Sequence, residues 1–519
     1  MSRTSVRDLL PRYTRGYLWI TFLVGIFMLM ALSENGVFSR DSILPNPALI
    51  RTYQTPLRGP PADFSMGYKK QSISKPTPTP VSESTPTPGA SKSAKKPVIE
   101  EGKKGEQITF NGLDPNDVVI MVKTGATSIW RRMPAHMSTT LGNPALTPNI
   151  VYYSDSPDNL NGSPVIDVLA NVSSTLKSSP DFELYQKAKD VASQNLYLES
   201  GSMEGDFYLP GGWRLDKYKF VPMFAHVAEY MPGKKWYIYM EDDNYFFWSN
   251  LYSWLGTLDH TSPLLIGSPA FRLGEDFAHG GSGFAISGKA LSISFLAEKD
   301  LADRFEEYAR EQCCGDQVLS HVLHSKGVER YKELDGGGWA ALQSLPHWRI
   351  GFGTWNWCSP IMNVHKVHQA DISRLHVFER GFKAKKGEAR MRYRDVFLGM
   401  AKGNINAEEK SEWDNYAAAK TFASSSDPDV NAGVNGGKEG KKISQVEMAK
   451  KPWYSKEACK KACVEWELCL SWKYADDNCA LDHTAAMGQK IDAGIRMESG
   501  WMLDRIRELE KTKCEALSY

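Results

Sequence analysis

Apolar runs and helical repeats alternate over residues 114–423. Residues 118–122 are a continuous apolar run, which is typical of a buried parallel strand. Residues 149–153 and 235–240 have the same character and predict two further strands. A helix between these two strands is predicted by apolar residues at helical spacing, namely Phe220, Met223, Phe224, Val227 and Met231. Strands that alternate with helices predict an α/β domain with a mostly parallel sheet.

A long uncharged run lies near the start of the chain. Residues 16–33 carry no charge, and as a helix they would span roughly 27 Å, about the thickness of a bilayer core. The positive-inside rule places residues 1–15 in the cytosol and the rest of the chain in the lumen, because four arginines precede the run: Arg3, Arg7, Arg12 and Arg15. We expect an uncleaved signal anchor, and the alternative is a cleaved signal peptide and a secreted protein.

The composition changes after this run. Residues 45–97 hold 11 of the chain's 28 prolines, and such a segment cannot bury enough apolar surface to fold, so we expect an extended stalk. A second linker, rich in Gly, Ser and Lys, covers residues 424–451. Lys+Arg 62 and Asp+Glu 61 give a formal net charge of +1, which argues against nucleic acid as a partner.

Three adjacent carboxylates, Glu241, Asp242 and Asp243, directly follow the strand predicted at 235–240. They would repel one another unless a positive charge lies among them, and the carboxyl end of a parallel strand faces the crevice where α/β sheets bind ligands. Oxygen ligands suit Mn²⁺ or Mg²⁺, and such a cation can hold a diphosphate. The alternative is an acidic loop, or a helix cap formed by Asp243 or Asn244.

Four motifs follow one another along the chain: Glu241-Asp-Asp-Asn-Tyr245, Gly280-Gly-Ser-Gly-Phe-Ala-Ile-Ser287, Gly315-Asp316-Gln-Val-Leu and Asn363-Val-His365. In type and in order they resemble those of a glycosyltransferase family (family 31) that includes Fringe and the core 1 β1,3-galactosyltransferases, and its fungal branch in particular. The resemblance covers about residues 115–370. Two departures are Glu241, where Fringe has Asp, and Gly315, where the family has Glu; the Cys313-Cys314 pair before Gly315 is a further difference.

The resemblance implies an inverting GT-A transferase, with a mixed sheet flanked by helices, that uses a UDP-sugar and Mn²⁺ or Mg²⁺. Asp316 would be the general base that deprotonates the acceptor hydroxyl. The metal ligands would be Asp243, Asp242 and His365. The donor would lie against Gly280, Gly281 and Gly283 and contact Asp242, Asp155, Lys123 and Arg131.

Each of these assignments has a structural alternative. Asp316 could cap the helix predicted at 317–324, and the glycine run could be only a turn. His368 competes with His365 as a ligand. If Asp316 is not the base, Glu275 or Asp276 beside the glycine run becomes the candidate.

The C-terminal region, residues 452–519, is rich in cysteine. The spacing lacks the CxxC pairs of a zinc ribbon, so two disulfides are expected in an oxidising lumen. Nested pairs 459–479 and 463–469 are plausible, because Cys459 and Cys463 share one helical face. The spacing is similar to that of PAN/apple modules, which bind protein or carbohydrate. We further expect that Cys313 or Cys314 pairs with Cys358.

The combined prediction is a type II, single-pass Golgi membrane protein. It would move a hexose or N-acetylhexosamine to a hydroxyl of a glycan or glycoprotein, with a β1,3 linkage favoured, and its tail would offer a contact for a homodimer or another partner. Alternatives are a non-catalytic carbohydrate-binding or adhesion protein and a lumenal hydrolase with a carboxylate pair. The expected parts are a cytoplasmic tail (1–15), a transmembrane anchor (16–33), a stalk (34–113), a GT-A domain (114–423), a linker (424–451) and a PAN-like domain (452–519).

Overall fold

The computed structural model describes residues 109–194, 211–332, 342–387, 390–431, 444–492 and 494–516. All of them belong to one of the two compact units of the chain, Glu100–Tyr519. The expected cytoplasmic tail, the anchor and nearly all of the stalk lie outside the described residues. Within the described part of the chain, every helix is too short or too polar to cross a bilayer.

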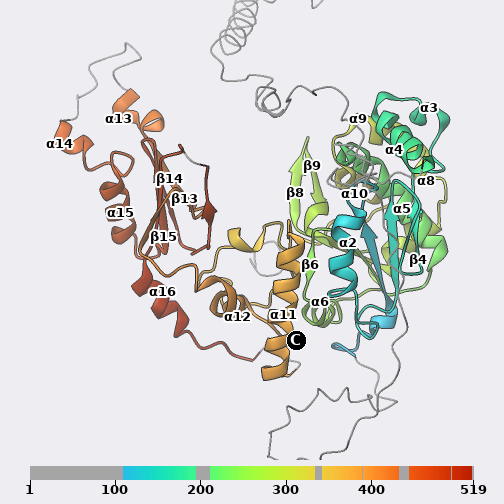
Figure 1. The fold of residues 1–519 in the computed structure, drawn as a ribbon, viewed down its shortest axis with the longest axis horizontal. Coiled ribbons are helices and arrows are strands. Elements are labelled where there is room, and N and C mark those ends of the chain that lie inside the picture. Colours follow the sequence, from blue (N-terminus) through green and yellow to red (C-terminus); the bar gives the residue numbers. More distant parts are fainter. Residues whose placement is uncertain are drawn as a thin grey trace, which may run out of the picture. The chain divides into compact units, whose positions relative to one another are not determined.

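A seven-stranded sheet forms the centre of the first part of this unit, in the order β3-β4-β2-β1-β5-β10-β7 (Figure 1). Strands β4, β2, β1 and β5 run parallel, whereas β3, β10 and β7 each pair antiparallel to their neighbour, so the sheet is mixed. The strands are β1 (Val118–Lys123), β2 (Ile150–Ser154), β3 (Asp158–Leu160), β4 (Ser163–Asp167), β5 (Trp236–Glu241), β7 (Leu265–Gly267) and β10 (Phe284–Ser287).

Helices cover both faces of this sheet, which is why the run in β1 is apolar throughout. Val119 and Met121 pack in one core with α5 (Asp216–Tyr230) and α10 (Gly315–His324). Alternate residues of β1 point to the other core, which holds α2 (Ile129–Met137) and α6 (Trp248–Leu255). The mixed sheet flanked by helices is therefore confirmed, and so are the predicted strands and helices around it.

The alternative in which Asp243 or Asn244 caps the following helix is wrong. Helix α6 begins at Trp248 with Phe247 as its N-cap, and a short strand, β6 (Tyr245–Phe246), lies between it and the triplet. Asn244 instead closes a turn, because its Oδ1 accepts the backbone N–H of Glu241 at 2.9 Å. Strand β6 pairs with β11 (Asn363–Val364), which brings the late motif next to the triplet.

The remaining elements of this first part connect the sheet to its helices and to the segments beyond. They are η5 (Pro115–Asp117), α3 (Ser174–Lys177), η6 (Pro180–Phe182), α4 (Glu183–Ser193), η7 (Gly212–Leu215), β8 (Pro269–Arg272), β9 (Glu275–Ala278), η8 (Gly280–Ser282), α7 (Gly288–Leu291), η9 (Ser292–Leu296), α8 (Leu301–Arg304), α9 (Glu306–Glu311), η10 (His347–Arg349), α11 (Gln369–Lys386), α12 (Tyr393–Val396) and η11 (Phe397–Ala401).

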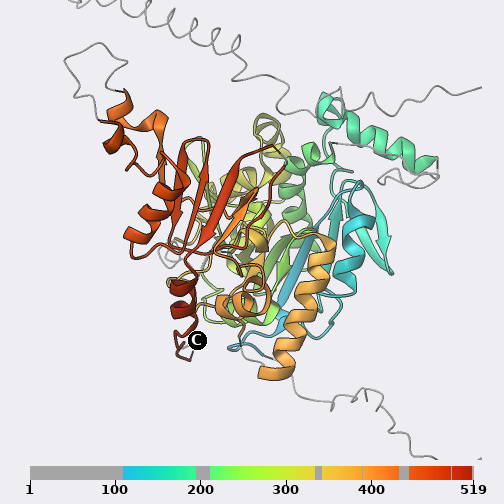
Figure 2. The ribbon, with the colours of Figure 1, turned by 60° about the vertical axis from the view of Figure 1, so that its left-hand side comes forward.

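A second, antiparallel sheet lies in the C-terminal part, in the order β12-β18-β15-β16-β14, and Figure 2 shows its strands side by side in orange and red. Two of its strands, β12 and β14, precede residue 424, so this sheet draws on residues before the linker expected at 424–451. The elements are β12 (Glu409–Ser411), β13 (Trp413–Asp414), β14 (Lys420–Ala423), η12 (Ser424–Ser426), α13 (Pro428–Asn431), α14 (Gln445–Met448), α15 (Lys456–Glu465), β15 (Ser471–Ala475), β16 (Asn478–Asp482), β17 (Gln489–Lys490), β18 (Met497–Trp501) and α16 (Leu503–Glu510).

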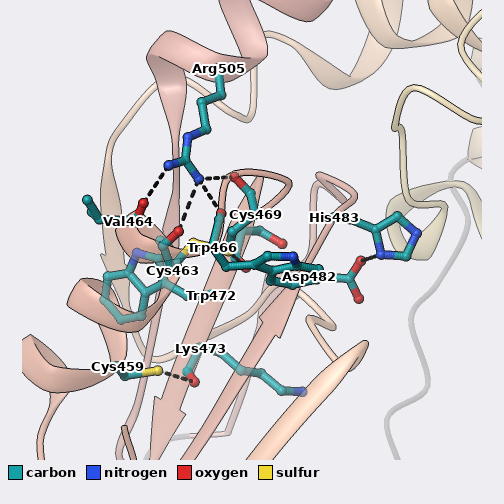
Figure 3. Close-up of a disulfide and its surroundings, with 12 residues drawn as sticks. Cys459, Cys463, Val464, Trp466, Cys469, Trp472, Lys473, Asp482, His483 and Arg505 are labelled. Atoms are coloured by element: carbon teal, nitrogen blue, oxygen red, sulfur yellow. Dashed lines mark hydrogen bonds and ion pairs between the residues drawn. A yellow bond between two sulfur atoms is a disulfide. The ribbon is translucent and has the colours of Figure 1, made fainter. Parts of the chain in front are cut away.

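Two disulfides and one arginine hold α15 to this sheet. The nested pairs Cys459–Cys479 and Cys463–Cys469 are both present and confirm the prediction. The guanidinium of Arg505, on α16, donates to the backbone carbonyls at and just beyond the end of α15 (Figure 3). These carbonyls have no partner within their own helix, so Arg505 satisfies them and ties α16 to the disulfide loop. Its acceptors are Cys463, Val464, Trp466 and Cys469.

The other cysteine expectation is wrong. Cys358 pairs with Cys514, 156 residues further along the chain, and Cys313 pairs with its neighbour Cys314. Cys358 lies beside the segment that follows α16, where Arg394 also donates to the carbonyl of Thr512 at 3.2 Å. The chain after α16 thus returns to the region around Cys358, a tertiary contact that no local spacing encodes.

Candidate active site

Polar side chains gather at the carboxyl ends of β1, β2 and β5. These strands are parallel and adjacent, so their ends meet at one edge of the sheet, where α/β sheets bind ligands. The glycine turn before β10, the first turn of α10 and strand β11 close around the same edge. The four sequence motifs therefore come together in space, although they are spread over 125 residues from Glu241 to His365.

Glu241, Asp243 and His365 form a cluster that could hold a metal ion, with one ligand atom of each within 4.8 Å of the others. Nδ1 of His365 lies 3.0 Å from the carbonyl oxygen of Ser344, which places the proton on Nδ1 and leaves Nε2 with a free lone pair. Nε2 lies 3.5 Å from Oδ1 of Asp243. Burial lowers the pKa of His365 to about 4, so the imidazole is neutral at pH 7, as a metal ligand must be.

Oδ1 of Asp243 is buried and has no hydrogen-bond partner. Burial, together with the neighbouring carboxylates Glu241 and Asp242, raises the pKa of Asp243 to about 7. An unpartnered carboxylate oxygen that faces the lone pair of a neutral imidazole is unfavourable unless a proton or a cation lies between them. The geometry therefore fits a cation held by Glu241, Asp243 and His365.

Asp242 has a different environment from its two neighbours. It is 4% exposed, and its carboxylate accepts hydrogen bonds from Thr124 Oγ1 at 2.6 Å and Ser128 Oγ at 2.9 Å. Arg132 Nη1 donates to its other oxygen at 2.5 Å. These partners occupy both carboxylate oxygens of Asp242, and it is not part of the cluster of candidate ligands. Glu241 is part of it, although the resemblance to the family assigned the ligand roles to Asp243, Asp242 and His365.

A chain of buried ion pairs runs from β2 to the cluster. Lys219 Nζ lies 3.1 Å from Asp155 Oδ1 and 2.9 Å from Asp216 Oδ1. Lys123 Nζ lies 2.8 Å from Asp216 Oδ2 and 3.3 Å from Glu241 Oε1. Burial alone would raise the pKa of Asp216, but Lys123 and Lys219 lower it to about 2, so this carboxylate is charged at neutral pH. The structure thus places Asp155 and Lys123 in a network that fixes the carboxylate of Glu241.

The two adjacent arginines of α2 have different surroundings. Arg131 is exposed, whereas the guanidinium of Arg132 lies against Asp242 and 3.5 Å from Asp243 Oδ2. Arg132 shares a helix face with the buried residues Ile129 and His136, three positions before it and four after it. The helical periodicity of α2 therefore directs Arg132, and not Arg131, towards the acidic triplet. The spacing of Ile129, Arg132 and His136 in the sequence is the signal that would have identified it.

The glycine turn lies between His365 and Asp316. A Cβ atom on Gly281 would collide with the imidazole of His365, and one on Gly280 would lie 3.1 Å from Cβ of Asp316. Gly283 has φ +70°, and a Cβ there would also lie 2.6 Å from the ring of Phe246. Close approach and backbone conformation therefore both require glycine here.

Asp316 lies in the first turn of α10 and binds the glycine turn directly. Its Oδ2 accepts the N–H of Gly280 at 2.6 Å, and its Oδ1 accepts the N–H of Gln317 at 2.9 Å. The N-cap position belongs to Cys314, whose side chain makes no capping bond. Burial raises the pKa of Asp316 above its ordinary value, although the two N–H groups act against the rise. A carboxylate with a raised pKa is a better proton acceptor, as a general base requires.

The glycine that replaces the family's glutamate has a packing reason. A Cβ atom on Gly315 would collide with the ring of Phe220, and it would lie 2.9 Å from the Cα of Lys217. Helices α10 and α5 therefore approach each other so closely that only glycine fits at position 315. The departure reflects helix packing and leaves Asp316 at the glycine turn.

The alternative candidates are engaged elsewhere. Glu275 accepts hydrogen bonds from Gln317 at 3.1 Å and from His321 at 2.5 Å. Burial would raise the pKa of Glu275, but these hydrogen bonds lower it, which makes this carboxylate a weaker base. Asp276 pairs with Arg330 at 2.8 Å. His368 caps α11 by accepting the N–H of Ala370 at 3.2 Å and is not in the cluster that contains His365.

Three comparisons with known proteins were made for this chain. Residues 113–326 match the model of the Fringe-like family. A solved structure of the glycosyltransferase GlyE of Streptococcus pneumoniae TIGR4 is similar over 42% of this chain and 46% of its own length, with 12% identity and a TM-score of 0.22. The search of curated proteins gave no match. The family match covers the acidic triplet, the glycine turn and Asp316, so residues 113–326 form a Fringe-like glycosyltransferase domain.

Proposed function

We propose that this domain is an inverting, metal-dependent transferase. It moves a hexose or N-acetylhexosamine from a UDP-sugar to a hydroxyl of a glycan or glycoprotein, with a β1,3 linkage favoured. The observation that carries the proposal is the unpartnered, buried Oδ1 of Asp243 facing Nε2 of His365. A divalent cation would satisfy both atoms together with the carboxylate of Glu241.

Mn²⁺ fits this donor set better than Mg²⁺, which prefers oxygen ligands alone, because a neutral imidazole accompanies the two carboxylates. When bound, the cation supplies positive charge that neutralises the leaving diphosphate. Glu241 is held ready for it by Lys123, whose ammonium is in turn fixed by Asp216. The ion-pair chain thus orients a ligand rather than contacting the donor itself.

Asp316 is the residue that accepts the proton of the acceptor hydroxyl. Its carboxylate contacts Gly280, whereas the imidazole of His365 lies against Gly281, so the base and the metal ligand lie against neighbouring residues of one glycine turn. A sugar placed against this turn would have the base on one side and the diphosphate ligands on the other. That arrangement supports attack opposite the leaving group, and hence inversion of the anomeric centre.

The location of the protein follows from the same proposal. All eight cysteines are paired, which fits the oxidising lumen of the secretory pathway. We propose a Golgi enzyme anchored through residues 16–33, with a PAN-like C-terminal module and membership of the fungal branch of the family. Protease protection of a C-terminal tag in sealed vesicles tests this topology, and digestion of the tag would contradict it.

Donor hydrolysis tests the activity without knowledge of the acceptor. The protein is incubated with UDP-galactose, UDP-N-acetylglucosamine or UDP-glucose, with and without Mn²⁺, and release of UDP is measured. We expect release from at least one donor that requires Mn²⁺ and disappears in Asp243→Asn. Asp117→Asn is the matched control, because Asp117 pairs with Lys235 at the opposite, amino-terminal ends of β1 and β5. Absence of release with every donor would favour a non-catalytic carbohydrate-binding protein.

A further inference from the structure

We infer that a cavity of about 320 Å³ between residues 343–356 and the C-terminal sheet is a binding site for the saccharide of the acceptor. The inference rests on the proposed function, because it names where the second substrate binds. The residues on which the argument depends are Gln343, Leu345, Arg349, Trp355, Tyr416 and His483, all of which line the cavity.

The cavity is continuous with the segment that holds the candidate metal ligand. Gln343 and Leu345 line it, and Ser344 between them accepts the Nδ1 proton of His365 at 3.0 Å. The N–H of His365 donates to the carbonyl of Leu345 at 3.2 Å, and the N–H of Gln343 donates to Oδ1 of Asn363 at 2.6 Å. One short stretch of backbone therefore contacts the active site on one side and the cavity on the other. A saccharide bound in the cavity lies beside the site of transfer.

Direct backbone pairing fixes the two walls of the cavity to each other. Phe352 and Ala485 exchange two backbone hydrogen bonds, at 3.1 and 2.9 Å, and the N–H of Gly488 donates to the carbonyl of Trp348 at 2.8 Å. The disulfide Cys358–Cys514 adds a covalent link between the segment just after the first wall and the chain that follows α16. Because neither wall depends on long side chains to meet the other, the cavity has a defined shape that suits recognition of a rigid ring.

The lining has the chemistry that sugars require. A pyranose presents an apolar C–H face, which packs on aromatic rings, and a rim of hydroxyl groups. Trp355 is 42% exposed, although it lies in the wall of a cavity. The guanidinium carbon of Arg349 lies over the ring of Tyr416, 4.7 Å from the centroid of that ring. Two aromatic residues thus face this space, one from each side of the junction.

The backbone conformation of Tyr416 is unusual for a residue with a side chain. Its φ of +60° lies in the left-handed region that non-glycine residues avoid, and such strain is concentrated at binding sites. Its hydroxyl accepts a hydrogen bond from Gln489 at 2.8 Å, which fixes the direction of the ring.

Polar groups with spare hydrogen-bonding capacity surround the aromatic rings. Among the described residues, no carboxylate lies within ion-pair distance of Arg349, so its N–H groups can donate to sugar hydroxyls. His483 is also exposed, with Nδ1 3.7 Å from Asp482 (Figure 3). Asp482 itself is occupied by the backbone N–H groups of Ala418 and Thr484. With its one carboxylate engaged in this way, the lining offers Arg349 and His483 to the hydroxyl groups of a saccharide.

A glycan array tests the inference on the full-length protein. The array carries immobilised oligosaccharides that end in galactose, glucose, mannose, fucose or N-acetylhexosamine. We compare the wild type with Trp355→Ala and with Tyr416→Gly, which removes the ring and keeps a residue suited to the positive φ. Tyr454→Ala is the control, because Tyr454 is an aromatic residue of similar exposure, 45%, that does not line the cavity.

We expect the wild type to bind at least one glycan, and both variants to lose about tenfold or more of that affinity. Mn²⁺-dependent hydrolysis of the UDP-sugar by water should remain unchanged in both variants, since neither residue touches the candidate metal cluster. Failure of the wild type to bind any glycan, or unchanged binding by both variants, would overturn the inference. Glycan binding without donor hydrolysis in the wild type would instead contradict the proposed function and leave the saccharide site standing.

Discussion

The two sheets of this protein are held together in different ways. The seven-stranded sheet is covered by helices on both faces, and its core is built from apolar strands. The core around α15 in the C-terminal sheet is small and consists of six buried residues, four of them cysteines: Cys459, Cys463, Cys469, Trp472, Cys479 and Leu481. A large apolar core can support buried charges at its edge, whereas a small core needs covalent links.

The largest effect is expected from Asp316→Asn in the Fringe-like domain. An amide cannot accept the acceptor proton, so transfer should fall by roughly 10²–10⁴-fold, while binding of the UDP-sugar and Mn²⁺ persists. Asn can accept only one of the two N–H groups that Asp316 now accepts, so the free energy of unfolding should fall by about 0.5–1.5 kcal/mol. Transfer rates and urea unfolding measure the two effects separately.

Asp167→Asn is the matched control for this variant. Asp167, on β4, likewise accepts one hydrogen bond on each carboxylate oxygen, in its case from the N–H of Leu169 at 3.0 Å and the hydroxyl of Tyr185 at 2.7 Å. Its stability loss should be comparable and its transfer rate normal. Near-normal transfer by Asp316→Asn would show that Asp316 is not the base. Its role would then be to stabilise the first turn of α10.

Removal of one buried charge should strongly destabilise the first region. Lys219 is 1% exposed and pairs with both Asp155 and Asp216. Lys219→Met leaves the buried carboxylate of Asp155 without its cationic partner, while Asp216 keeps its pair with Lys123, so the free energy of unfolding should fall by about 3–5 kcal/mol. Chemical denaturation measures this loss. Lys299→Met is the control, because Lys299 forms an exposed pair with Glu229 and should cost only about 0–1 kcal/mol. Equal losses of unfolding free energy in the two variants would show that the buried ion pairs of Lys219 stabilise the fold no more than an exposed pair does.

The C-terminal sheet should depend on its covalent links instead. Replacing both Cys459 and Cys479 by Ala opens a disulfide across a small core, and should lower the free energy of unfolding of this region by about 2–5 kcal/mol. Hydrolysis of the donor should persist, because the candidate metal cluster lies in the other sheet. Replacing both Cys313 and Cys314 is the control, since a bond between sequence neighbours closes almost no loop. Loss of donor hydrolysis with the first pair alone would contradict the separation of roles.

A smaller, pH-dependent effect is expected at Asp243. Its pKa of about 7 in the folded protein lies above the ordinary value of 3.8, so between these values the folded state binds more protons than the unfolded state. The metal-free protein should therefore lose stability as pH rises from about 4 to 7. Thermal melting at several pH values checks this slope, which Asp243→Asn should flatten. A wild-type slope that Asp243→Asn leaves unchanged would assign the titration to another group.

Features with a local signal in the sequence were predictable. The strands β1, β2 and β5 and the helices α5 and α10 begin and end within one or two residues of the expected positions, because each has its own apolar pattern and stop signal. The nested disulfides followed from the helical spacing of Cys459 and Cys463. The disulfide Cys358–Cys514 and the close contact of Gly315 with Phe220 depend on tertiary packing, which local spacing does not carry.

The orientation of the acidic triplet could not be predicted from strand periodicity. Strand β5 ends at Glu241, and Asp242 and Asp243 lie in the turn that Asn244 closes, so strand alternation does not apply to them. This turn brings Glu241 and Asp243 together with His365 and places Asp242 against α2, where Arg132 meets it. The family pattern named Asp242 as a ligand, because it treats the three carboxylates as one motif.

Direct titration of Mn²⁺ into the metal-free protein tests the central claim, that Glu241, Asp243 and His365 form a cation site. Calorimetry at pH 8, where Asp243 is ionised, should give one site in the wild type and in the control Asp117→Asn. Asp243→Asn should lose this site, because a neutral amide removes the negative charge that faces His365. Equal Mn²⁺ affinity in Asp243→Asn and the wild type would contradict the account.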